Sequence, residues 1–467
     1  MKYICWVLII SIISIIMGCK IEKEASFEML ERPYTCRDFG GRGIDVGQSC
    51  AICKDGSVLI TGFTQSIDGD LKGVRDFTSK DKSSKHIDKD LWVLKIEPKE
   101  DKILYNKCFG GSKNDYGFSI AETVDENIIV TGYTESIDGD LEGTIINNLS
   151  PRSSKSLWIL KIDPKKDKIL YNKSLGESGV IGCGNSIAET KDGNIIITGE
   201  IQADEQLETF ETIQGGYDLL VLMIDPKKDK ILYKHCFGGK GDDRGFSIVE
   251  SNDGHLIVAG TTNSVDGDLS GAGFHYGKYK DFNNKINIYP DIWLLKIDPK
   301  NDKILYNKCF GGSKFDAVNS AVKCSDDSIF IAGVTNSSNG HLFGQRIGSK
   351  NMDVWVLKVD ITKDKILYNK CFVETGKNFV ATVISQTKDN NILLAAIGIS
   401  STLVTEINPS LSSNKQIQYS RFFKEHASAI ASTDDGKIVI TGFENSSKYK
   451  SVNVILLIIE PPNLESP

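Results

Sequence analysis

The chain has 467 residues, of which 25% are charged and 40% hydrophobic, and its formal net charge is -7. This composition is typical of a folded globular protein and excludes a disordered polymer. The acidic balance also argues against non-specific nucleic-acid binding, because phosphate backbones are bound by clustered Lys and Arg. Length alone would suggest about three domains, but the repeats described below replace that expectation with one.

The N-terminus has the pattern of an export signal. Lys2 is the only charge before an apolar run that ends at Met17, and this run is too short to span a bilayer comfortably. A charged start, an apolar core and a small residue before the cut are typical of a secretory signal. The sequence Gly18-Cys19 resembles the lipobox of bacterial lipoproteins, which implies cleavage before Cys19 and lipidation of its thiol. The alternatives are a plain signal peptide or a membrane anchor with an incidental cysteine.

From this pattern we expect a signal peptide over residues 1–18 and a tether over residues 19–31. Several acyl chains on Cys19 would hold the protein on a membrane. In Gram-negative lipoproteins an Asp after the lipidated cysteine resembles an inner-membrane retention signal, and this chain has Lys20 there. The predicted location is therefore the cell envelope, and the outer membrane if the cell is Gram-negative.

Seven copies of one sequence unit follow. The clearest copies share a stretch of the form Asp-Leu-Trp-Val-Leu-Lys-Ile-Asp, at residues 90–97, 156–163, 291–298 and 353–360. Weaker copies begin at Asp218, Thr402 and Asn453. Such repetition is the signature of an architecture built from similar supersecondary units.

Each unit contains four strand-like runs, here named a to d. In the second unit they cover residues 116–123, 127–134, 157–162 and 168–175. Runs b and c are apolar at both alternating positions, which predicts sheets covered on both faces, whereas run d is more polar, as an outer edge strand is. Four-stranded sheets buried between similar neighbours are typical of propeller blades.

The ends of the chain predict how the ring is completed. The seventh unit stops after run c, at residues 452–460, and an orphan run d, at residues 32–39, precedes the first unit. We therefore expect an all-β fold: a seven-bladed β-propeller of four-stranded antiparallel blades over residues 32–460, closed by the N-terminal strand completing the last blade. Residues 461–467 would be a tail. The alternative is an open solenoid.

Alternating strand direction sorts the connections onto two faces. The d-to-a and b-to-c connections share one face, called the loop face, and the a-to-b and c-to-d connections share the other, called the turn face. The b-to-c connections vary most in length and are longest in units one, two and four. Long loops on a rigid scaffold commonly carry binding residues, so the loop face is the predicted binding face.

Two carboxylate patterns recur on the loop face. The first is the phrase Asp-Gly-Asp, which supplies the candidate binding residues Asp68, Asp70, Asp138, Asp140, Asp266 and Asp268. Paired carboxylates are compatible with Ca²⁺. The favoured interpretation is an Asx-type turn, because two Asp provide too few of the oxygen ligands that Ca²⁺ requires.

The second pattern is an Asp four residues before a Ser, at the start of run a. Its members are Asp45, Asp115, Asp243 and Asp316, followed by Ser49, Ser119, Ser247 and Ser320. A ring of carboxylates near the mouth of the central channel would suit a cation or a polar ligand. Structural capping of the loop is the favoured interpretation, because the pattern follows the repeat.

The sequence contains no recognisable catalytic motif. Its six His are scattered without an H-E-x-x-H pattern, and no G-x-S-x-G elbow occurs. The repeated Trp are expected to pack between blades rather than to form a sugar platform. Four of the 11 Cys occupy one repeat position on different blades, too far apart for disulfides, and are expected to be small buried residues: Cys108, Cys236, Cys309 and Cys371. No cofactor is predicted, and the metal content is left open.

The repeat as a whole resembles one found in exported surface proteins and lipoproteins of bacteria and archaea. The resemblance implies an exported propeller but no common activity. We expect a monomeric, lipid-anchored module that binds or scaffolds a protein or a glycan and has no nucleic-acid partner. The alternative is a glycan-active hydrolase or lyase that uses acidic residues near the channel. Whether the protein is an enzyme stays open, with a binding role favoured.

Overall fold

The structure is a computed structural model of the chain. It describes residues 33–74, 88–100, 102–142, 155–175, 180–203, 213, 215–274, 277–280, 286–345, 352–372, 379–398, 401–411, 416–446 and 451–460. The predicted signal peptide, the tether with Cys19 and the tail at 461–467 lie outside these ranges. In the part of the chain that is described, no helix combines the length and hydropathy needed to cross a bilayer.

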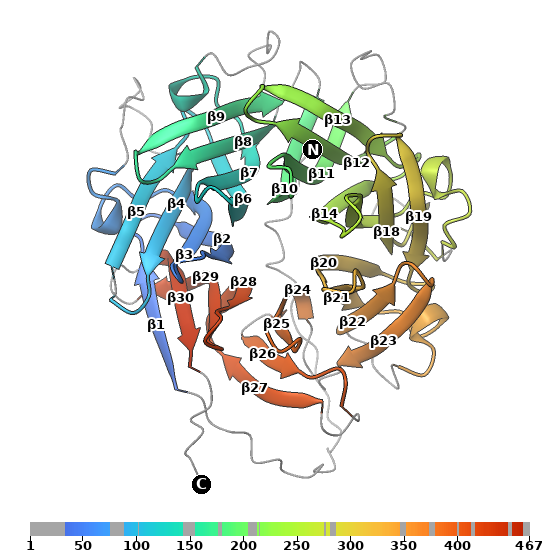
Figure 1. Cartoon of the computed structure of the whole chain (residues 1–467). Helices are drawn as coiled ribbons and strands as arrows, with labels where there is room; N and C mark the ends of the chain where they lie inside the picture. The colour runs from blue at the N-terminus through green and yellow to red at the C-terminus, as the bar shows by residue number, and fades with distance from the viewer. Residues whose placement is uncertain are drawn as a thin grey trace.

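Seven four-stranded antiparallel sheets are arranged in a ring around a central axis (Figure 1). In blades 1 to 3 the strands are, from the innermost outward, β2 (Asp45–Ile52), β3 (Val58–Thr64), β4 (Asp90–Glu97) and β5 (Lys102–Phe109); β6 (Asp115–Glu122), β7 (Ile128–Thr134), β8 (Ser156–Asp163) and β9 (Lys168–Leu175); β10 (Val180–Glu189), β11 (Ile195–Ala203), β12 (Asp218–Asp225) and β13 (Lys230–Phe237).

Blades 4 to 6 repeat this order. Their strands are β14 (Asp243–Glu250), β15 (Leu256–Thr262), β18 (Asp291–Asp298) and β19 (Lys303–Phe310); β20 (Asp316–Lys323), β21 (Ile329–Thr335), β22 (Asp353–Asp360) and β23 (Lys365–Phe372); β24 (Phe379–Gln386), β25 (Ile392–Gly398), β26 (Thr402–Ile407) and β27 (Ile417–Phe423). The predicted seven-bladed propeller of four-stranded antiparallel blades is confirmed.

Blade 7 combines the two ends of the propeller. It contains β28 (His426–Ser432), β29 (Ile438–Ser446), β30 (Ser451–Ile459) and, as its outermost strand, β1 (Tyr34–Phe39). β1 runs antiparallel to β30, with Tyr34 opposite Ile459 and Phe39 opposite Val454. What this pairing contributes to the stability of the ring remains a prediction.

The hydrophobic core lies between successive blades. Every residue of β3 and of β7 is buried, so these strands are covered on both faces as their apolar sequence predicts. Trp158 of blade 2 packs in one cluster with Leu91 and Val93 of blade 1. The repeated Trp therefore pack between blades, and each apolar strand stabilises two interfaces at once.

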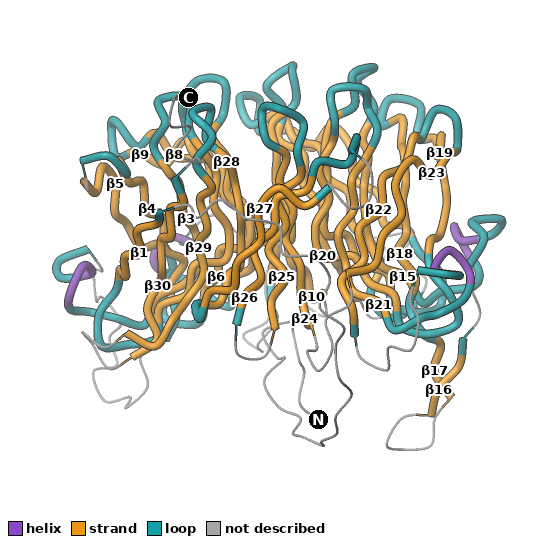
Figure 2. Tube along the Cα trace, turned by 90° about the horizontal axis from the view of Figure 1, so that it is seen from below, coloured by secondary structure: helices purple, strands orange, loops and turns teal. Residues whose placement is uncertain are grey.

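One additional hairpin was not predicted. The b-to-c connection of blade 4 contains β16 (Lys278–Lys280) and β17 (Ile286–Ile288). This hairpin projects from the loop face of the ring (Figure 2). At its base Tyr279 and Tyr289 stack with ring centroids 4.7 Å apart. Strands of three residues carry too little alternation to be recognised from sequence.

Each inner strand contains a β-bulge. In β6 the pairing with β7 shifts between Gly117 and Ser119, which leaves Phe118 as the extra residue. The strands approach closely beside the bulge, and a Cβ added to Gly132 would lie 1.9 Å from the carbonyl oxygen of Tyr116. Bulges re-aim a side chain and are frequent beside functional sites, and this one places Phe118 at the inner strand of its blade.

Candidate functional site

The predicted ring of carboxylates is buried. Asp45, Asp115, Asp243 and Asp316 are each 0% exposed at the first position of an inner strand. Asp115 is typical: Oδ2 accepts hydrogen bonds from Ser136 Oγ at 2.8 Å and from the Gly111 amide at 3.0 Å, and Oδ1 accepts one from Thr134. These donors belong to the connections that each Asp holds in place, so structural capping accounts for the pattern.

Neighbouring carboxylates make burial of the ionised form of these Asp side chains less favourable. Burial raises the pKa of Asp115 to about 7, and Asp90 of the preceding blade adds to that effect, while the hydrogen bonds from Thr134 and Ser136 oppose it. Burial likewise raises the pKa of Asp316 to about 7 and that of Asp243 to about 6. Burial thus disfavours the ionised form of these carboxyls, which argues against a cation site.

The Asp-Gly-Asp phrases form 3₁₀ turns that fasten the incoming loop. Three of these turns are η1 (Gly69–Leu71), η2 (Gly139–Leu141) and η3 (Gly267–Leu269), and a fourth, η4 (Gly340–Leu342), has His341 in place of the second Asp. In blade 2 Asp138 accepts the Ser112 amide at 2.8 Å and Asp140 accepts the Gly110 amide at 2.9 Å.

The same bonds recur in the other two Asp-Gly-Asp blades. Asp68 accepts the Arg42 amide at 2.8 Å and Asp70 the Gly40 amide at 3.0 Å. Asp266 accepts the Lys240 amide at 2.8 Å and Asp268 the Gly238 amide at 3.0 Å. A turn therefore accounts for all six carboxylates, and within the described ranges no group of three His, Cys, Asp or Glu is placed to hold a metal ion.

Calcium removal is expected to leave the propeller unchanged. Each Asp-Gly-Asp carboxylate already accepts a backbone amide, so we expect the same melting temperature in EDTA and in excess CaCl₂. As a control, Asp140→Ala should lower stability by about 1–2 kcal/mol, because the Gly110 amide loses its acceptor. A calcium-dependent rise in the melting temperature of the unmodified protein would contradict the turn interpretation.

The repeated Trp have a second structural contact. Trp92 Nε1 donates to Asn106 Oδ1 at 2.7 Å, and Asn106 Nδ2 donates to the Asp70 carbonyl at 2.7 Å. The same chain recurs at Trp158, Asn172 and Asp140; at Trp293, Asn307 and Asp268; and at Trp355, Asn369 and His341. These indoles are buried and tie strands c and d to the turn, so they present no face to a sugar.

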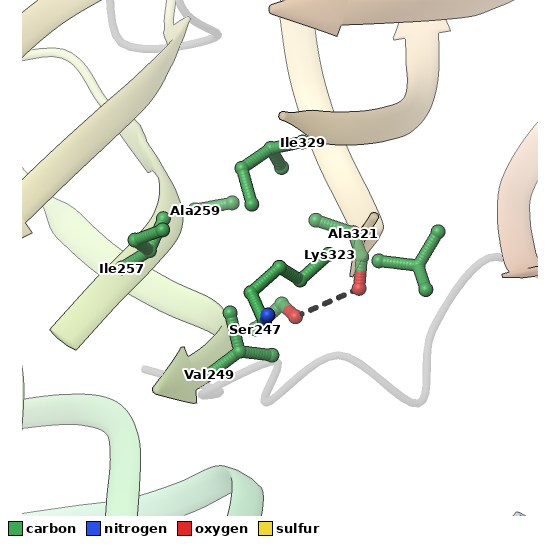
Figure 3. A pocket seen from close by; sticks show the side chains of 8 residues that line it. Ser247, Val249, Ile257, Ala259, Ala321, Lys323 and Ile329 are labelled. Atoms are coloured by element: carbon green, nitrogen blue, oxygen red, sulfur yellow. Dashed lines mark hydrogen bonds between the residues drawn. The ribbon is translucent and has the colours of Figure 1, made fainter. Parts of the chain in front are cut away.

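The Ser that follow the buried Asp act between blades. The Ile187 amide donates to Ser119 Oγ at 3.2 Å, and Ser247 Oγ donates to the Ala321 carbonyl at 3.0 Å. The latter bond lies at a partly open gap between blades 4 and 5, which has a volume of about 10 Å³ and is lined mainly by aliphatic side chains (Figure 3). Ligand pockets commonly measure about 300–1,000 Å³, so this gap is too small to be the site.

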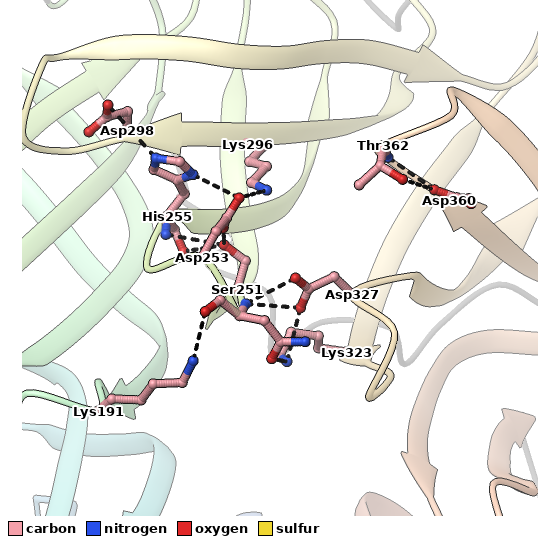
Figure 4. A network of polar contacts seen from close by, with 11 residues as sticks. Lys191, Ser251, Asp253, His255, Lys296, Asp298, Lys323, Asp327, Asp360 and Thr362 are labelled. Carbon is pink, nitrogen blue, oxygen red and sulfur yellow. Dashed lines mark hydrogen bonds and ion pairs between the residues drawn. The ribbon is translucent and has the colours of Figure 1, made fainter.

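The turn face carries a polar network that joins neighbouring blades (Figure 4). Asp253 lies between Lys296 at 2.7 Å and His255 at 3.1 Å. Burial acts to raise the pKa of Asp253, but hydrogen bonds from Lys296 and Ser251 outweigh it and lower that pKa. The Ser251 hydroxyl has Asp253 Oδ1 and the His255 carbonyl as its acceptors, and it does not bond the imidazole. The cluster therefore lacks the nucleophile–base pair of a hydrolase.

A group of aromatic and cationic side chains lies at the loop-face ends of strands in blades 1 and 2. We call it the mouth cluster and define it as Phe63, Lys89, Tyr116, Phe118, Tyr133 and Lys155. Tyr116 and Tyr133 stack at 4.7 Å, and Phe63 meets Tyr116 edge-on at 4.8 Å. Phe63, Tyr116 and Tyr133 form one buried cluster, and Phe118 packs against it.

Lysine side chains lie over these rings. Lys89 Nζ is 4.5 Å from the centroid of Phe63 and 5.0 Å from that of Tyr116, and Lys155 Nζ is 4.4 Å from that of Tyr133. Cations over aromatic faces at such distances are attracted by the ring quadrupole. The mouth cluster was not predicted from the sequence. A partial signal was available, because Lys89 and Lys155 depart from the repeat, whereas Phe63 and Tyr133 share their repeat position with Phe443 of blade 7.

A buried ion pair continues the mouth in blades 3 and 4. Arg244 Nε lies 2.5 Å from Glu200 Oε2, and the guanidinium is 4.6 Å from the ring centroid of Tyr217. Burial raises the pKa of Glu200 despite the opposing effect of Arg244. Blade 3 has neither the buried Asp nor the Asp-Gly-Asp phrase, and this pair lies where the other blades carry neutral side chains.

The cysteines follow the prediction in part. Cys236 and Cys309 are buried, but Cys108 and Cys371 are only half-buried, because the outermost strand has one face toward solvent. No disulfide joins two cysteines of the described ranges. Cys19, the predicted lipidation site, lies outside those ranges.

Comparison with known proteins shows the fold and no more. No protein-family model matches the chain, and no curated protein does. Among solved structures it is similar to hydrazine synthase from Kuenenia stuttgartiensis, with a TM-score of 0.50 and 9% identity over 87% of this chain and 94% of that one. The Dos1 propeller is similar with a TM-score of 0.46 and 12% identity, over 92% of this chain and 95% of that one. A catalytically inactive virginiamycin B lyase from Staphylococcus aureus is similar with a TM-score of 0.47 and 11% identity, over 91% of this chain and 99% of that one. These neighbours have no activity in common.

Proposed function

We propose that the protein is a lipid-anchored propeller of the cell envelope whose loop face binds a protein or a glycan. The observation that carries the proposal is the mouth cluster. The first two blades gather four aromatic rings and two lysines there, and the lysines depart from the residues that the next three blades have at this repeat position. Departure from a repeat at clustered positions on one face is typical of a binding site on a repeat scaffold.

The strand order supports an anchor that leaves this face accessible. β30 runs from the loop face to the turn face, and β1 begins with Tyr34 opposite the end of β30, at Ile459. A tether that precedes Tyr34 would therefore join the propeller at the turn face. If Cys19 carries lipid, the loop face points away from the membrane.

The enzyme alternative has less support from the geometry. The acidic residues on which it depended are buried and hydrogen-bonded within their own loops. In the described ranges of the mouth, the acid Glu200 is paired with Arg244. A general acid needs access to the reacting group, so a binding module is the better interpretation.

Crosslinking on intact cells tests this proposal. A lysine-reactive crosslinker followed by mass spectrometry should place partner or glycan-linked adducts at loop-face residues such as Lys89, Lys113 and Lys155. Turn-face residues Lys166 and Lys228, whose side chains are each 77% exposed, are the internal control for reactivity. Adducts concentrated on the turn face would overturn the assignment of the binding face. Unaltered membrane retention of a Cys19→Ala variant would overturn the lipid anchor.

A further inference from the structure

Lys89 and Lys155 occupy the same position in successive blades. Each residue precedes strand c and lies at the junction with the next blade: the Lys89 carbonyl accepts the Asp115 amide at 2.7 Å, and the Lys155 carbonyl accepts the Gly182 amide at 2.9 Å. The next three blades have Tyr217, Pro290 and Met352 at this position. The backbone role is thus common to the repeat, whereas the positive charge is particular to blades 1 and 2.

The two ammonium groups flank one aromatic stack. Lys89 Nζ lies over Tyr116, Tyr116 stacks on Tyr133, and Lys155 Nζ lies over Tyr133. These contacts keep the two nitrogens within about 14 Å of each other. The two charges are therefore close enough to act on a single ligand.

Neither ammonium lies within ion-pair distance of a carboxylate among the described residues, although Glu135 is near Lys89 and Glu200 is near Lys155. No ion pair of Lys89 or Lys155 occurs among the described residues, whereas Lys95 and Lys161, at the opposite ends of the same c strands, lie 3.0 Å from Asp55 and 3.2 Å from Asp125. Glu135 lies near Lys89, but its Oε2 accepts the Asn114 side-chain amide at 3.0 Å.

Both lysines are half-buried. Burial lowers the pKa of Lys89, an effect that Glu135 opposes and Lys155 reinforces. Two like charges held near each other with little solvent are unfavourable by themselves. An anion bound between them would offset that cost.

We propose that Lys89 and Lys155 form an oxyanion-binding site that takes an acidic carbohydrate, a chain of uronic acid residues. The proposal rests on the binding role of the loop face and names its ligand class. Carboxylates repeated along a stiff sugar chain can reach both ammonium groups. A peptide would also need exposed apolar surface to pack against. Phe63, Tyr116 and Tyr133 offer little, because they are only 2%, 7% and 5% exposed.

Binding of oligogalacturonate to the full chain in detergent tests this inference. We expect the unmodified protein to bind it, more weakly at higher salt, and not to bind the fully methyl-esterified chain, which has the same sugars without the charge. The double variant Lys89→Gln/Lys155→Gln should lose at least about tenfold in affinity, and Lys89→Arg/Lys155→Arg should retain binding. Lys240→Gln is the matched control, because that exposed loop-face lysine lies outside the mouth and pairs with Asp266 at 3.5 Å.

Unchanged melting temperatures establish that the variants are folded. Equal affinity in the double Gln variant would overturn the site, and so would binding of the neutral ester. Equal binding of poly-glutamate would overturn the assignment to carbohydrate. If the full chain binds no oxyanion while crosslinks still concentrate on the loop face, this inference fails and the proposed binding role stands; if the crosslinks also fall on the turn face, both fail.

Discussion

Phe39→Ala is expected to destabilise the propeller by about 3–5 kcal/mol, as large aromatic truncations in a core do. Phe39 is the last residue of β1 and is 7% exposed. It packs in one cluster with Val58 and Trp92 of blade 1 and with Val454 of blade 7. Its side chain therefore joins the first and last blades, and the substitution would open a cavity at that junction.

Phe422→Ala is the matched control for this experiment. Phe422 lies on β27, an outermost strand like β1, but it is 41% exposed, so its truncation should change stability by much less. Deleting residues 33–39 should have a larger effect than Phe39→Ala, because β30 would lose its hydrogen-bonded partner. Thermal melting of each variant is the measurement. Equal melting temperatures for the Phe39 and Phe422 variants would mean that β1 does not hold the ring together.

The free energy of unfolding is expected to fall as the pH rises from about 4 to about 7. The folded-state pKa of Asp115 is about 7, against 3.8 for an unperturbed Asp carboxyl, so the folded state retains a proton that the unfolded chain releases in this range. The difference corresponds to about 4 kcal/mol as an order of magnitude. Asp316 and Asp243 act in the same direction, with pKa values of about 7 and about 6.

Other carboxylates limit stability in acid. Burial acts to raise the pKa of Asp55, but hydrogen bonds from Ser57 and Lys95 outweigh it and lower that pKa to about 2. Its contribution is present above the unfolded pKa and is lost as the pH falls from about 4 to about 2. Maximal stability is therefore expected in mild acid, near pH 4, where both contributions are present.

The Asp115→Asn variant isolates the loss of stability that the raised pKa of Asp115 causes as the pH rises. Urea unfolding between pH 4.5 and pH 8 should show a smaller decline with pH in this variant than in the unmodified protein, whatever its absolute stability, because the asparagine does not titrate. Asp192→Asn, in the a-to-b turn of blade 3, is the control and should keep the full decline. An unchanged slope in Asp115→Asn would show that burial of this carboxyl does not govern the pH dependence.

Strand identity and blade number followed from the sequence because each depends on local pattern. Residues 168–175 were predicted as a strand with the bounds that β9 has, and the run predicted at 116–123 differs from β6 by one residue at each end. Repetition strengthened the prediction, because seven imperfect copies of one unit show the same hydrophobic periodicity.

The bulge, the hairpin and the mouth cluster depended on tertiary structure. A bulge changes pairing by one residue without a distinctive composition, and Phe118 was visible only as part of an apolar run. Contacts between blades were equally hidden: Asp167, in a turn of blade 2, lies 2.7 Å from Lys107 of blade 1, 60 residues earlier. Such pairs are close in space because the ring curves, and no spacing in the sequence reports that curvature.

The sequence by itself determined that this protein is a ring of seven similar β-sheet units, because hydrophobic periodicity and turn residues specify strands locally. Only the tertiary structure decided which of its repeated polar residues are structural. The buried Asp and the Asp-Gly-Asp pairs resembled ligand sets in the sequence, yet their oxygens accept hydrogen bonds from backbone amides of the d-to-a connections. Lys89 and Lys155 had no motif, and they became candidates because the fold places two cations over one aromatic stack without an ion pair to any described residue.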